Sequence, residues 1–331
     1  MTKAFPLVPL CEMSDGQEAD LFALLAAKQE ATTREGKAYW RVTFRDAKRE
    51  VSFPIWADSP HLEACRETWQ PGEFYKLRAL YRETSFGPQL EIRRIRAVTP
   101  ADAADGFDAA MCLPRSQFES NRLFDAILKI AETEIGDENL RRLVIDLYRQ
   151  YQDILLTLPA ARRNHHAFVG GYLEHVWNVV RNAILLVDKY LADYPNHAAL
   201  LSRDVVIAGA LLHDIGKVQE LNLTPAGAEY TAVGELIGHV LLGRDLLRDA
   251  ATRFPLSPET LLRLEHIIVS HQRLPEWGAP KPPMTAEAIL IHFADDTDAK
   301  LQTAFAALSD GSGAFTTSRN PLQYKLFRGL E

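Results

Sequence analysis

The residues best suited to chemistry are an adjacent histidine and aspartate, His213 and Asp214, which follow the apolar run 205–212. Gly216 comes two residues later and is expected to end the helix that this run predicts. An imidazole nitrogen beside a carboxylate can bind one divalent cation, and the carboxylate can also bridge two cations. Taken alone, the pair fits a buried histidine–aspartate hydrogen bond at a helix end equally well.

Further potential ligands lie on other apolar segments. Nine of the ten histidines lie at position 165 or beyond. His175 lies within a long amphipathic pattern, His239 follows a glycine before another helical pattern, and His271 ends an apolar run. Asp295 also follows an apolar run, where an unpaired carboxylate would be expensive to bury. Several such residues on helices that must share one core favour a metal site over separate buried polar residues.

The second half of the chain supplies the helices that must position these residues. From residue 116 to about residue 308 the apolar positions recur with helical spacing. Ser116 and Glu119 predict a capping box at the start of this region. Only residues 221–231, which contain a proline and a glycine, predict a hairpin or loop. We therefore expect residues 116–331 to form an all-α helical bundle.

The first hundred residues have the alternating pattern of strands instead. Turn residues, including Phe86 and the glycine after it, separate four such runs: 39–46, 51–56, 74–81 and 89–95. Several short strands in a segment of this length favour an all-β, five-stranded barrel of the OB type in residues 1–99. Residues 100–115, rich in alanine and aspartate, are expected to form a linker between the two domains.

Composition and charge limit the class of protein. Hydrophobic residues make up 47% of the 331 residues and charged residues 24%, which is typical of soluble globular proteins. The net charge of −7 lies almost entirely beyond residue 100, so the helical half is acidic and compatible with bound cations. The nearly neutral first half can still present a basic face to nucleic acid.

The cysteines and the apolar runs favour a cytoplasmic location. The three cysteines form no C-x-x-C pair, which favours reduced thiols over a disulfide framework. The first eleven residues contain too short an apolar run for a signal peptide. The apolar run near the centre of the chain is also far shorter than the about 20 residues that a membrane span requires. We expect a soluble protein with no membrane partner.

The candidate metal-binding residues also belong to longer sequence motifs. The pattern His175 … His213-Asp214 … Asp295 resembles the HD superfamily of metal-dependent phosphohydrolases. The runs 164–175, 238–239, 268–271 and 292–300 make the chain similar to the YhaM-type 3′→5′ exoribonucleases. In that family an OB domain precedes the HD domain, so the resemblance covers most of the chain.

The resemblance implies that one divalent metal is held by four residues: His175, His213, Asp214 and Asp295. In members with two metals, residues at the positions of His239 and His271 hold the second, and Asp214 bridges both. Relatives often carry two adjacent histidines where this chain has His271 and Gln272, so a weaker second site is expected. Asp298, one helical turn beyond Asp295, is an alternative ligand, although the motif favours Asp295.

The implied mechanism is hydrolysis of a phosphodiester. Imidazole and carboxylate ligands suit Mn²⁺, Fe²⁺, Co²⁺ or Zn²⁺, and two such cations would activate water and stabilise a leaving 3′ oxygen. Asp214 and Lys217 are the predicted catalytic residues, because the Lys217 ammonium can hold a non-bridging phosphate oxygen. The alternative for Lys217 is a solvated lysine beyond a helix end. His165 and His166 are expected either to contact substrate or to cap the following helix.

The barrel is expected to bind single-stranded nucleic acid, because OB barrels stack bases on aromatic rings and hold phosphates with basic residues. The predicted contacts are Trp40, Trp56, Tyr81, Arg41 and Arg78. Most other aromatic residues must fill the barrel core, and the strand register decides which side chains are exposed. A purely structural barrel is the alternative.

Three functions remain open on the sequence alone. The leading hypothesis is a 3′→5′ exonuclease that degrades single-stranded RNA, with DNA as a further substrate. The second is a phosphohydrolase of nucleotides or other small phosphate esters, in which the barrel serves assembly. The third is a single-strand-binding protein without turnover. Oligomerisation is compatible with all three.

Overall fold

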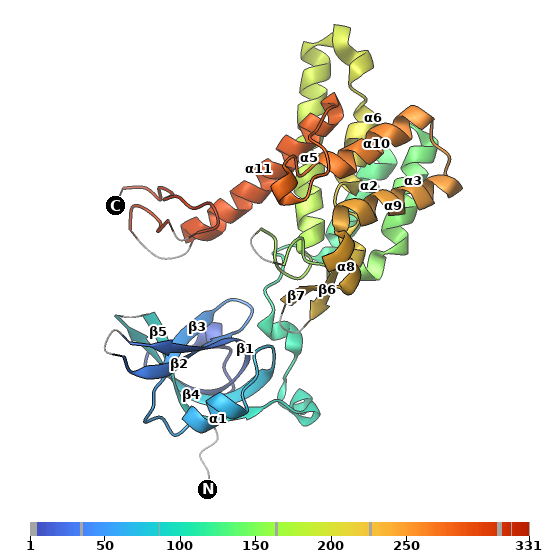
Figure 1. Ribbon diagram of the computed structural model, residues 1–331. Coiled ribbons are helices and arrows are strands. Elements are labelled where there is room, and N and C mark those ends of the chain that lie inside the picture. The colour runs from blue at the N-terminus through green and yellow to red at the C-terminus, as the bar shows by residue number, and fades with distance from the viewer. Residues whose placement is uncertain are drawn as a thin grey trace. The chain divides into compact units, whose positions relative to one another are not determined.

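The computed structural model divides the chain into two compact units (Figure 1): residues 1–115 with 224–227, and residues 116–223 with 228–331. The structure describes residues 5–33, 36–85, 87–162, 165–224, 227–309, 313–318 and 320–330. Phe86, predicted in a turn, and Asn164, the first residue of a motif run, lie outside the described residues. No helix within these ranges is both long and apolar enough to cross a membrane.

The first unit is an antiparallel sheet with strand order β3-β2-β1-β4-β5. Its strands are β1 (Glu18–Thr32), β2 (Ala38–Arg45), β3 (Glu50–Ile55), β4 (Phe74–Thr84) and β5 (Gly87–Ala97). The two outer strands, β3 and β5, contact each other, so the sheet curves back on itself. The helix α1 (Leu62–Glu67) connects β3 to β4. This order is that of the OB fold and confirms the predicted all-β first domain.

The central strand β1 is the one that the sequence patterns did not predict. Its segment is rich in alanine, leucine, lysine, glutamine and glutamate, which favour helix on intrinsic propensity. In the sheet β1 pairs with both β2 and β4, and its register shifts between Leu25 and Ala27. Burial of its apolar side chains, Leu21 and Leu25 among them, outweighs the local preference, because strand formation depends strongly on context.

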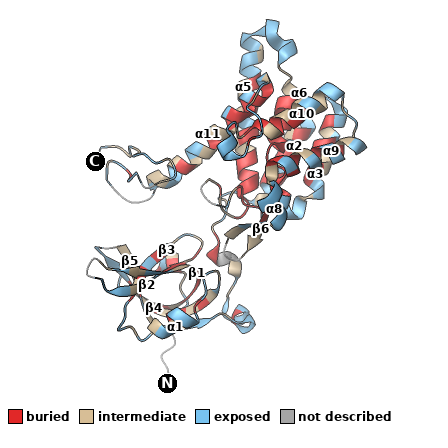
Figure 2. Cartoon of the chain, viewed as in Figure 1, coloured by how far each residue is buried: buried red, intermediate tan, exposed pale blue. Residues whose placement is uncertain are grey.

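The second unit is a helical bundle around one buried helix, as predicted. Every residue from Val205 to Leu212 in α6 (Arg203–Leu212) is buried, and a helix that is apolar on all sides belongs within a core. Figure 2 shows buried stretches of α5, α6 and α10 in the middle of this unit. The helices packed against α6 include α2 (Ser120–Glu134), α3 (Glu138–Gln150), α5 (Gly171–Asp193), α10 (Pro258–Ser270) and α11 (Ala286–Ser309).

One further long helix, α9 (His239–Arg253), belongs to the helical unit. Shorter elements there are α4 (Gln152–Leu155), α7 (Lys217–Glu220) and α8 (Ala232–Ile237). Two short strands, β6 (Leu221–Thr224) and β7 (Gly227–Tyr230), lie between α7 and α8, and their residues Thr224 and Gly227 group with the first unit. The strands β6 and β7 form a two-stranded sheet, so the segment predicted as a hairpin or loop is a hairpin. The predicted linker 100–115 contains two 3₁₀ helices, η2 (Pro100–Asp105) and η3 (Ala109–Cys112), and groups with the first unit.

The predicted capping box of Ser116 and Glu119 is wrong. The helix α2 begins only at Ser120, and the side chain of Glu119 makes no capping hydrogen bond. Ser116 Oγ instead donates to Glu174 Oε2 at 2.6 Å. Ser116 thus forms a long-range hydrogen bond to α5 instead of the predicted capping bond, and its Oγ also accepts one from the Phe118 backbone N–H at 3.0 Å.

Gly216 allows two backbone segments to meet directly after the histidine–aspartate pair. A Cβ at this position would lie 1.9 Å from the carbonyl oxygen of His239 and 2.5 Å from the nitrogen of Gly243. Only glycine fits so close an approach, which holds the start of α9, and with it His239, beside the end of α6.

We expect Gly216→Ala to lower the free energy of unfolding more than Gly209→Ala. The obstacle at Gly216 is backbone, whereas a Cβ at Gly209 would meet the ends of the Ile267 and Ile291 side chains at 2.7 Å, which can move. Overpacking costs about 1–3 kcal/mol, and we expect the Gly216 variant to lose about 3 kcal/mol or more of its free energy of unfolding. Urea unfolding of both variants measures the difference, and equal losses would contradict this account.

Candidate metal centre

Asp214 is buried just beyond α6, and its two carboxylate oxygens face different histidines. Oδ2 lies 3.6 Å from Nε2 of His175 and 3.5 Å from Nε2 of His213. Oδ1 lies 3.5 Å from Nε2 of His239 and 3.4 Å from Nε2 of His271. One carboxylate thus stands between two pairs of imidazoles, which is the arrangement expected of a ligand that bridges two cations.

The structure brings all six predicted metal ligands together, although they come from five different helices. Three lie directly beyond the last residue of a helix, two of them after α6 and one after α10, and one begins α9, so helix ends converge on the site. The remaining two project from the long helices α5 and α11. The six residues are His175, His213, Asp214, His239, His271 and Asp295.

Two of the imidazoles are oriented by backbone carbonyl groups. His213 Nδ1 donates to the carbonyl oxygen of Ala210, and His271 Nδ1 donates to that of Ile268, each at 2.8 Å. A carbonyl oxygen only accepts, so Nδ1 carries the proton and Nε2 keeps its lone pair. Both lone pairs are therefore available on the side that faces Asp214.

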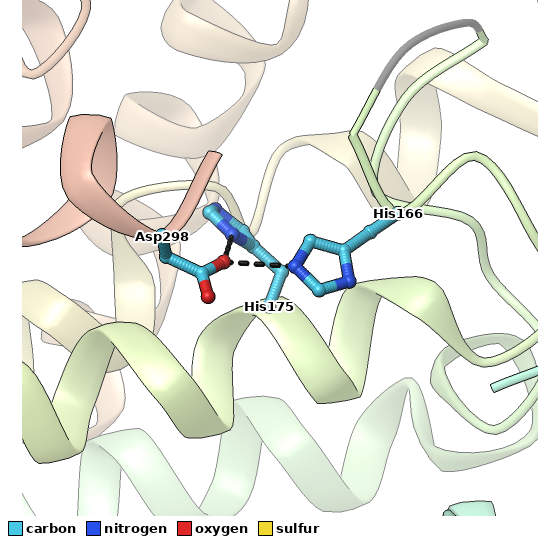
Figure 3. A group of neighbouring side chains, drawn as sticks. All are labelled: His166, His175 and Asp298. Carbon is cyan, nitrogen blue, oxygen red and sulfur yellow. Dashed lines mark hydrogen bonds and ion pairs between the residues drawn. The ribbon is translucent and has the colours of Figure 1, made fainter. Parts of the chain in front are cut away.

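Carboxylates orient the other two imidazoles. Asp298 Oδ2 accepts hydrogen bonds from His175 Nδ1 at 2.7 Å and from His166 Nε2 at 2.9 Å (Figure 3). Glu220 Oε1 accepts from His239 Nδ1 at 2.9 Å and from the His239 backbone N–H at 2.8 Å. Carboxylate–histidine pairs of this kind fix the tautomer of a metal ligand and raise its basicity.

Asp295 and Asp298 meet opposite nitrogens of the His175 ring. Asp295 Oδ1 lies 3.3 Å from Nε2, the nitrogen that also faces Asp214, whereas Asp298 is bonded to Nδ1. This geometry favours Asp295 as the ligand and gives Asp298 the task of orienting His175. The assignment of Asp295 as a metal ligand stays a prediction.

The two carboxylates at the centre of the cluster stay ionised. Burial would raise the pKa of Asp214, but the Lys217 ammonium and the neighbouring imidazoles hold it well below its usual range. Burial would also raise the pKa of Asp295, yet its hydrogen bond to His175 lowers it. Burial would lower the pKa of His175, but hydrogen bonds to two carboxylates raise it to about 9. Burial lowers the pKa of His213 to about 4, which keeps its lone pair free.

The residues present fit bound divalent metal. Asp214 Oδ1 and His239 Nε2 are buried and have no hydrogen-bond partner among the described residues. An unpaired buried carboxylate oxygen is costly, and a cation between it and the imidazoles would satisfy both atoms. Imidazole and carboxylate together are the donor set of divalent transition metals.

The supporting residues were only partly visible in the sequence. His292 begins the motif run 292–300, and its Nδ1 donates to the carbonyl oxygen of His271 at 2.8 Å. From the sequence, neither Glu220 nor His166 was predicted to support a metal ligand, and no role was predicted for Glu220. A glutamate in a short helix carries no sequence signal until its partner imidazole has been placed.

A pocket of about 670 Å³ lies beside the metal centre, within the helical unit. Its wall contains the candidate ligand His239 and the predicted catalytic residue Lys217. His165, one of the two histidines for which a substrate contact was considered, also lines it, whereas His166 is buried. The other residues that matter below are Arg162, Tyr230, Gln272 and Trp277.

Lys217 is buried rather than solvated, so the alternative interpretation of this residue is wrong. Only 6% of it is exposed, and its Nζ forms an ion pair with Asp214 Oδ2 at 2.5 Å. It also lies in the pocket wall, between the candidate bridging ligand and the space open to a substrate. Its contact with a phosphate oxygen stays a prediction.

Gln272 reaches the second pair of histidines. Its amide nitrogen lies 3.1 Å from Nε2 of His271, and His271 must accept there because its Nδ1 already donates to a carbonyl group. The amide thus competes for the lone pair that a second cation would use. This contact agrees with the expectation of a weaker second site.

The five predicted nucleic-acid contacts in the barrel differ in the exposure and in the contacts of their side chains. Trp56 is 44% exposed and its ring lies 4.9 Å from that of Tyr39. Arg41 is exposed as well. Trp40 is half-buried, packs on the barrel core and carries the Lys28 ammonium 5.2 Å from its ring centroid. These three residues remain candidates for strand binding.

The prediction for Tyr81 is wrong, because the alternation of β4 turns this residue into the barrel core. Tyr81 is 2% exposed and shares the inward face of the strand with Leu77, so no base can stack on it. Arg78 points to the other face, but its guanidinium is bound to Asp20 through two hydrogen bonds of 2.7 and 2.9 Å. A phosphate would have to compete with that carboxylate.

The two supporting carboxylates make a testable pair. We expect Asp298→Asn to weaken metal binding at the His175 side and Glu220→Gln to weaken it at the His239 side, each by about 10- to 100-fold. Titration of chelator-stripped protein with Co²⁺, followed by absorption, separates the two binding steps. Asp296→Asn removes a carboxylate that pairs with Lys300 on the same helix and serves as the control. If both variants weakened the same step, the division into two sides would be incorrect.

Comparison with known protein families agrees with the geometry. The family model described as HD domain matches residues 172–300, a range that contains all six candidate ligands. A second family model, described as "Putative helicase", matches residues 111–228. A solved domain of replication protein A from Methanococcus maripaludis aligns with 28% of this chain and 94% of its own at 9% identity, with a TM-score of 0.23. A score this low carries no weight in the assignment of the barrel.

Similar curated proteins span nearly the whole chain. The 3′-5′ exoribonuclease YhaM of Bacillus licheniformis is 31% identical, over 88% of this chain and 88% of its own. The YhaM proteins of Bacillus subtilis and Listeria monocytogenes are 30% and 32% identical, also over 88% of both chains. Identity at this level over this length shows that the chain belongs to the YhaM family of 3′-5′ exoribonucleases.

Proposed function

We propose that this chain is a metal-dependent exoribonuclease that removes nucleotides from the 3′ end of single-stranded RNA by hydrolysis. The observation that carries the proposal is the meeting of four imidazoles around the Asp214 carboxylate, beside an open pocket, in a member of this family. A carboxylate between two ligand sets can hold a pair of cations close enough to act together on a phosphodiester.

The candidate ligands divide into two sets that share Asp214. One set consists of His175, His213, Asp214 and Asp295, and the other of Asp214, His239 and His271. Divalent cations bound there would polarise the phosphate and supply water acidic enough to attack phosphorus. Mn²⁺, Fe²⁺, Co²⁺ and Zn²⁺ suit this mixture of nitrogen and oxygen donors better than Mg²⁺ does.

Lys217 supplies a fixed positive charge at the pocket wall. Burial would lower its pKa, but Asp214 raises it, so the ammonium is charged over the physiological range. In the proposed mechanism it binds a non-bridging phosphate oxygen and stabilises the negative charge that develops there during the attack.

The barrel contributes to strand binding in this proposal. Trp56 and Arg41 are exposed, and the combination of an aromatic face and a guanidinium suits a base and its phosphate. We expect the barrel to add affinity for single strands without contributing to the chemistry, because all the candidate ligands lie in the other unit.

One observation favours a second candidate function. The pocket volume of about 670 Å³ lies within the range of sites that enclose small ligands. Hydrolysis of nucleotides or other small phosphate esters is therefore the alternative that the experiment must separate.

We expect single-stranded RNA with a 5′ label to give a ladder that shortens progressively from the 3′ end when Mn²⁺ is present. EDTA should abolish the ladder and added Mn²⁺ should restore it, because the ligand sets hold the cations that the chemistry needs. Gel electrophoresis of timed samples is the measurement. Internal cuts throughout the strand, or hydrolysis confined to mononucleotides, would contradict the proposal.

A further inference from the structure

Trp277 presents an exposed aromatic ring in the wall of the pocket beside the metal centre. It ends the short helix η5 (Pro275–Trp277), which follows the candidate ligand His271 in the chain. The residue is 51% exposed, so about half of the hydrophobic stabilisation available to so large a side chain is not used within the fold. An aromatic ring left open in a concave wall indicates that a ligand covers it.

The loop that carries Trp277 is held by its own hydrogen bonds. The Trp277 backbone N–H donates to the carbonyl oxygen of Leu274 at 3.0 Å, and that of Ala279 donates to the same oxygen at 3.2 Å. Ala279 is buried against the fold. The ring is therefore presented from an ordered turn that begins directly after His271, and its position is tied to the metal centre.

A second aromatic residue and a cation line the same pocket. Tyr230, the last residue of β7, is 41% exposed, and the guanidinium carbon of Arg162 lies 5.7 Å from its ring centroid. No described carboxylate lies within 4 Å of the Arg162 guanidinium. The tyrosine ring thus holds at the pocket edge a positive charge that no anion of the described chain neutralises.

These groups match the chemistry of a nucleic-acid strand. Bases stack on aromatic rings whatever their identity, and phosphates bind guanidinium groups through charge-assisted hydrogen bonds. A small phosphate ester without a base would need the cation and the metal centre but not the tryptophan face. The pocket therefore carries more recognition surface than the hydrolytic chemistry alone requires.

We propose that Trp277, Tyr230 and Arg162 form a binding site for the terminal nucleotides of the strand that is being cut. Trp277 stacks on a base, Tyr230 positions Arg162, and Arg162 binds a backbone phosphate. The inference rests on the proposed function and deepens it, because it gives the helical unit its own means of holding the strand end. Stacking does not distinguish the bases, so the site accepts all four.

The test compares Trp277→Ala and Trp277→Phe with the wild-type protein on 5′-labelled single-stranded RNA. Loss of one stacked base raises KM by about 5- to 150-fold, whereas kcat and the metal content per chain stay near wild type. Trp277→Phe retains an aromatic face and most of the affinity. Tyr194→Ala removes a similarly exposed ring that lines a different groove and leaves KM unchanged. A KM in Trp277→Ala within twofold of wild type overturns the proposal.

Arg162→Ala provides a second variant that cannot fail through loss of packing, because Arg162 is exposed. Loss of one phosphate contact on a single strand lowers the slope of log affinity against log salt by about 0.7. An unchanged slope overturns the role of Arg162.

Binding of a 5′-labelled five-nucleotide RNA in EDTA separates this inference from the proposed function, because it needs no hydrolysis. Wild-type protein that binds this RNA through Trp277 but never cuts it would retain the site and contradict the exoribonuclease. Wild-type protein that cuts RNA, with binding and KM unaffected by Trp277→Ala, would retain the exoribonuclease and contradict the site.

Discussion

A buried carboxylate surrounded by four imidazoles is the constraint on which the helical unit depends. Asp214 cannot remain ionised in a protein interior unless positive charge is placed against it. Lys217 supplies one such charge at Oδ2, while Oδ1 has no hydrogen-bond partner among the described residues. In the proposed function, divalent cations bound beside the carboxylate would resolve this imbalance and would supply the hydrolytic chemistry.

The fold meets this constraint by ending helices at the site rather than running them past it. The buried apolar stretch 205–212 of α6 leads directly to His213 and Asp214, and the close approach of Gly216 to the start of α9 sets His239 beside them. The supporting acceptors, whether carbonyl groups or carboxylates, then turn each Nε2 inward. The positions of the candidate ligands are therefore set by the close approach of two backbone segments and by the hydrogen bonds that each imidazole Nδ1 donates to a supporting acceptor.

The sequence predicted the parts of this arrangement that depend on local pattern. The buried helix followed by the histidine–aspartate pair and the helical bundle follow from apolar periodicity, whereas the set of six candidate ligands was implied by the resemblance to the HD superfamily. The strand β1 and the partner of Ser116 could not be predicted, because long-range packing overrides local preference there. Tyr81 was misplaced for a related reason: a one-residue choice of register exchanges the two faces of a strand. Glu220 and Asp298 acquire their roles only through distant imidazoles.

The metal content of the wild-type protein and of Asp214→Asn tests the central claim most directly. Both proteins are saturated with Mn²⁺, passed through a desalting column and analysed for metal and protein by mass spectrometry. The account predicts more than one ion per chain in the wild type and almost none in the variant, because the amide loses the charge and the bridging oxygen that both ligand sets share. Equal metal content in the two proteins, with the helical fold intact by circular dichroism, would contradict it.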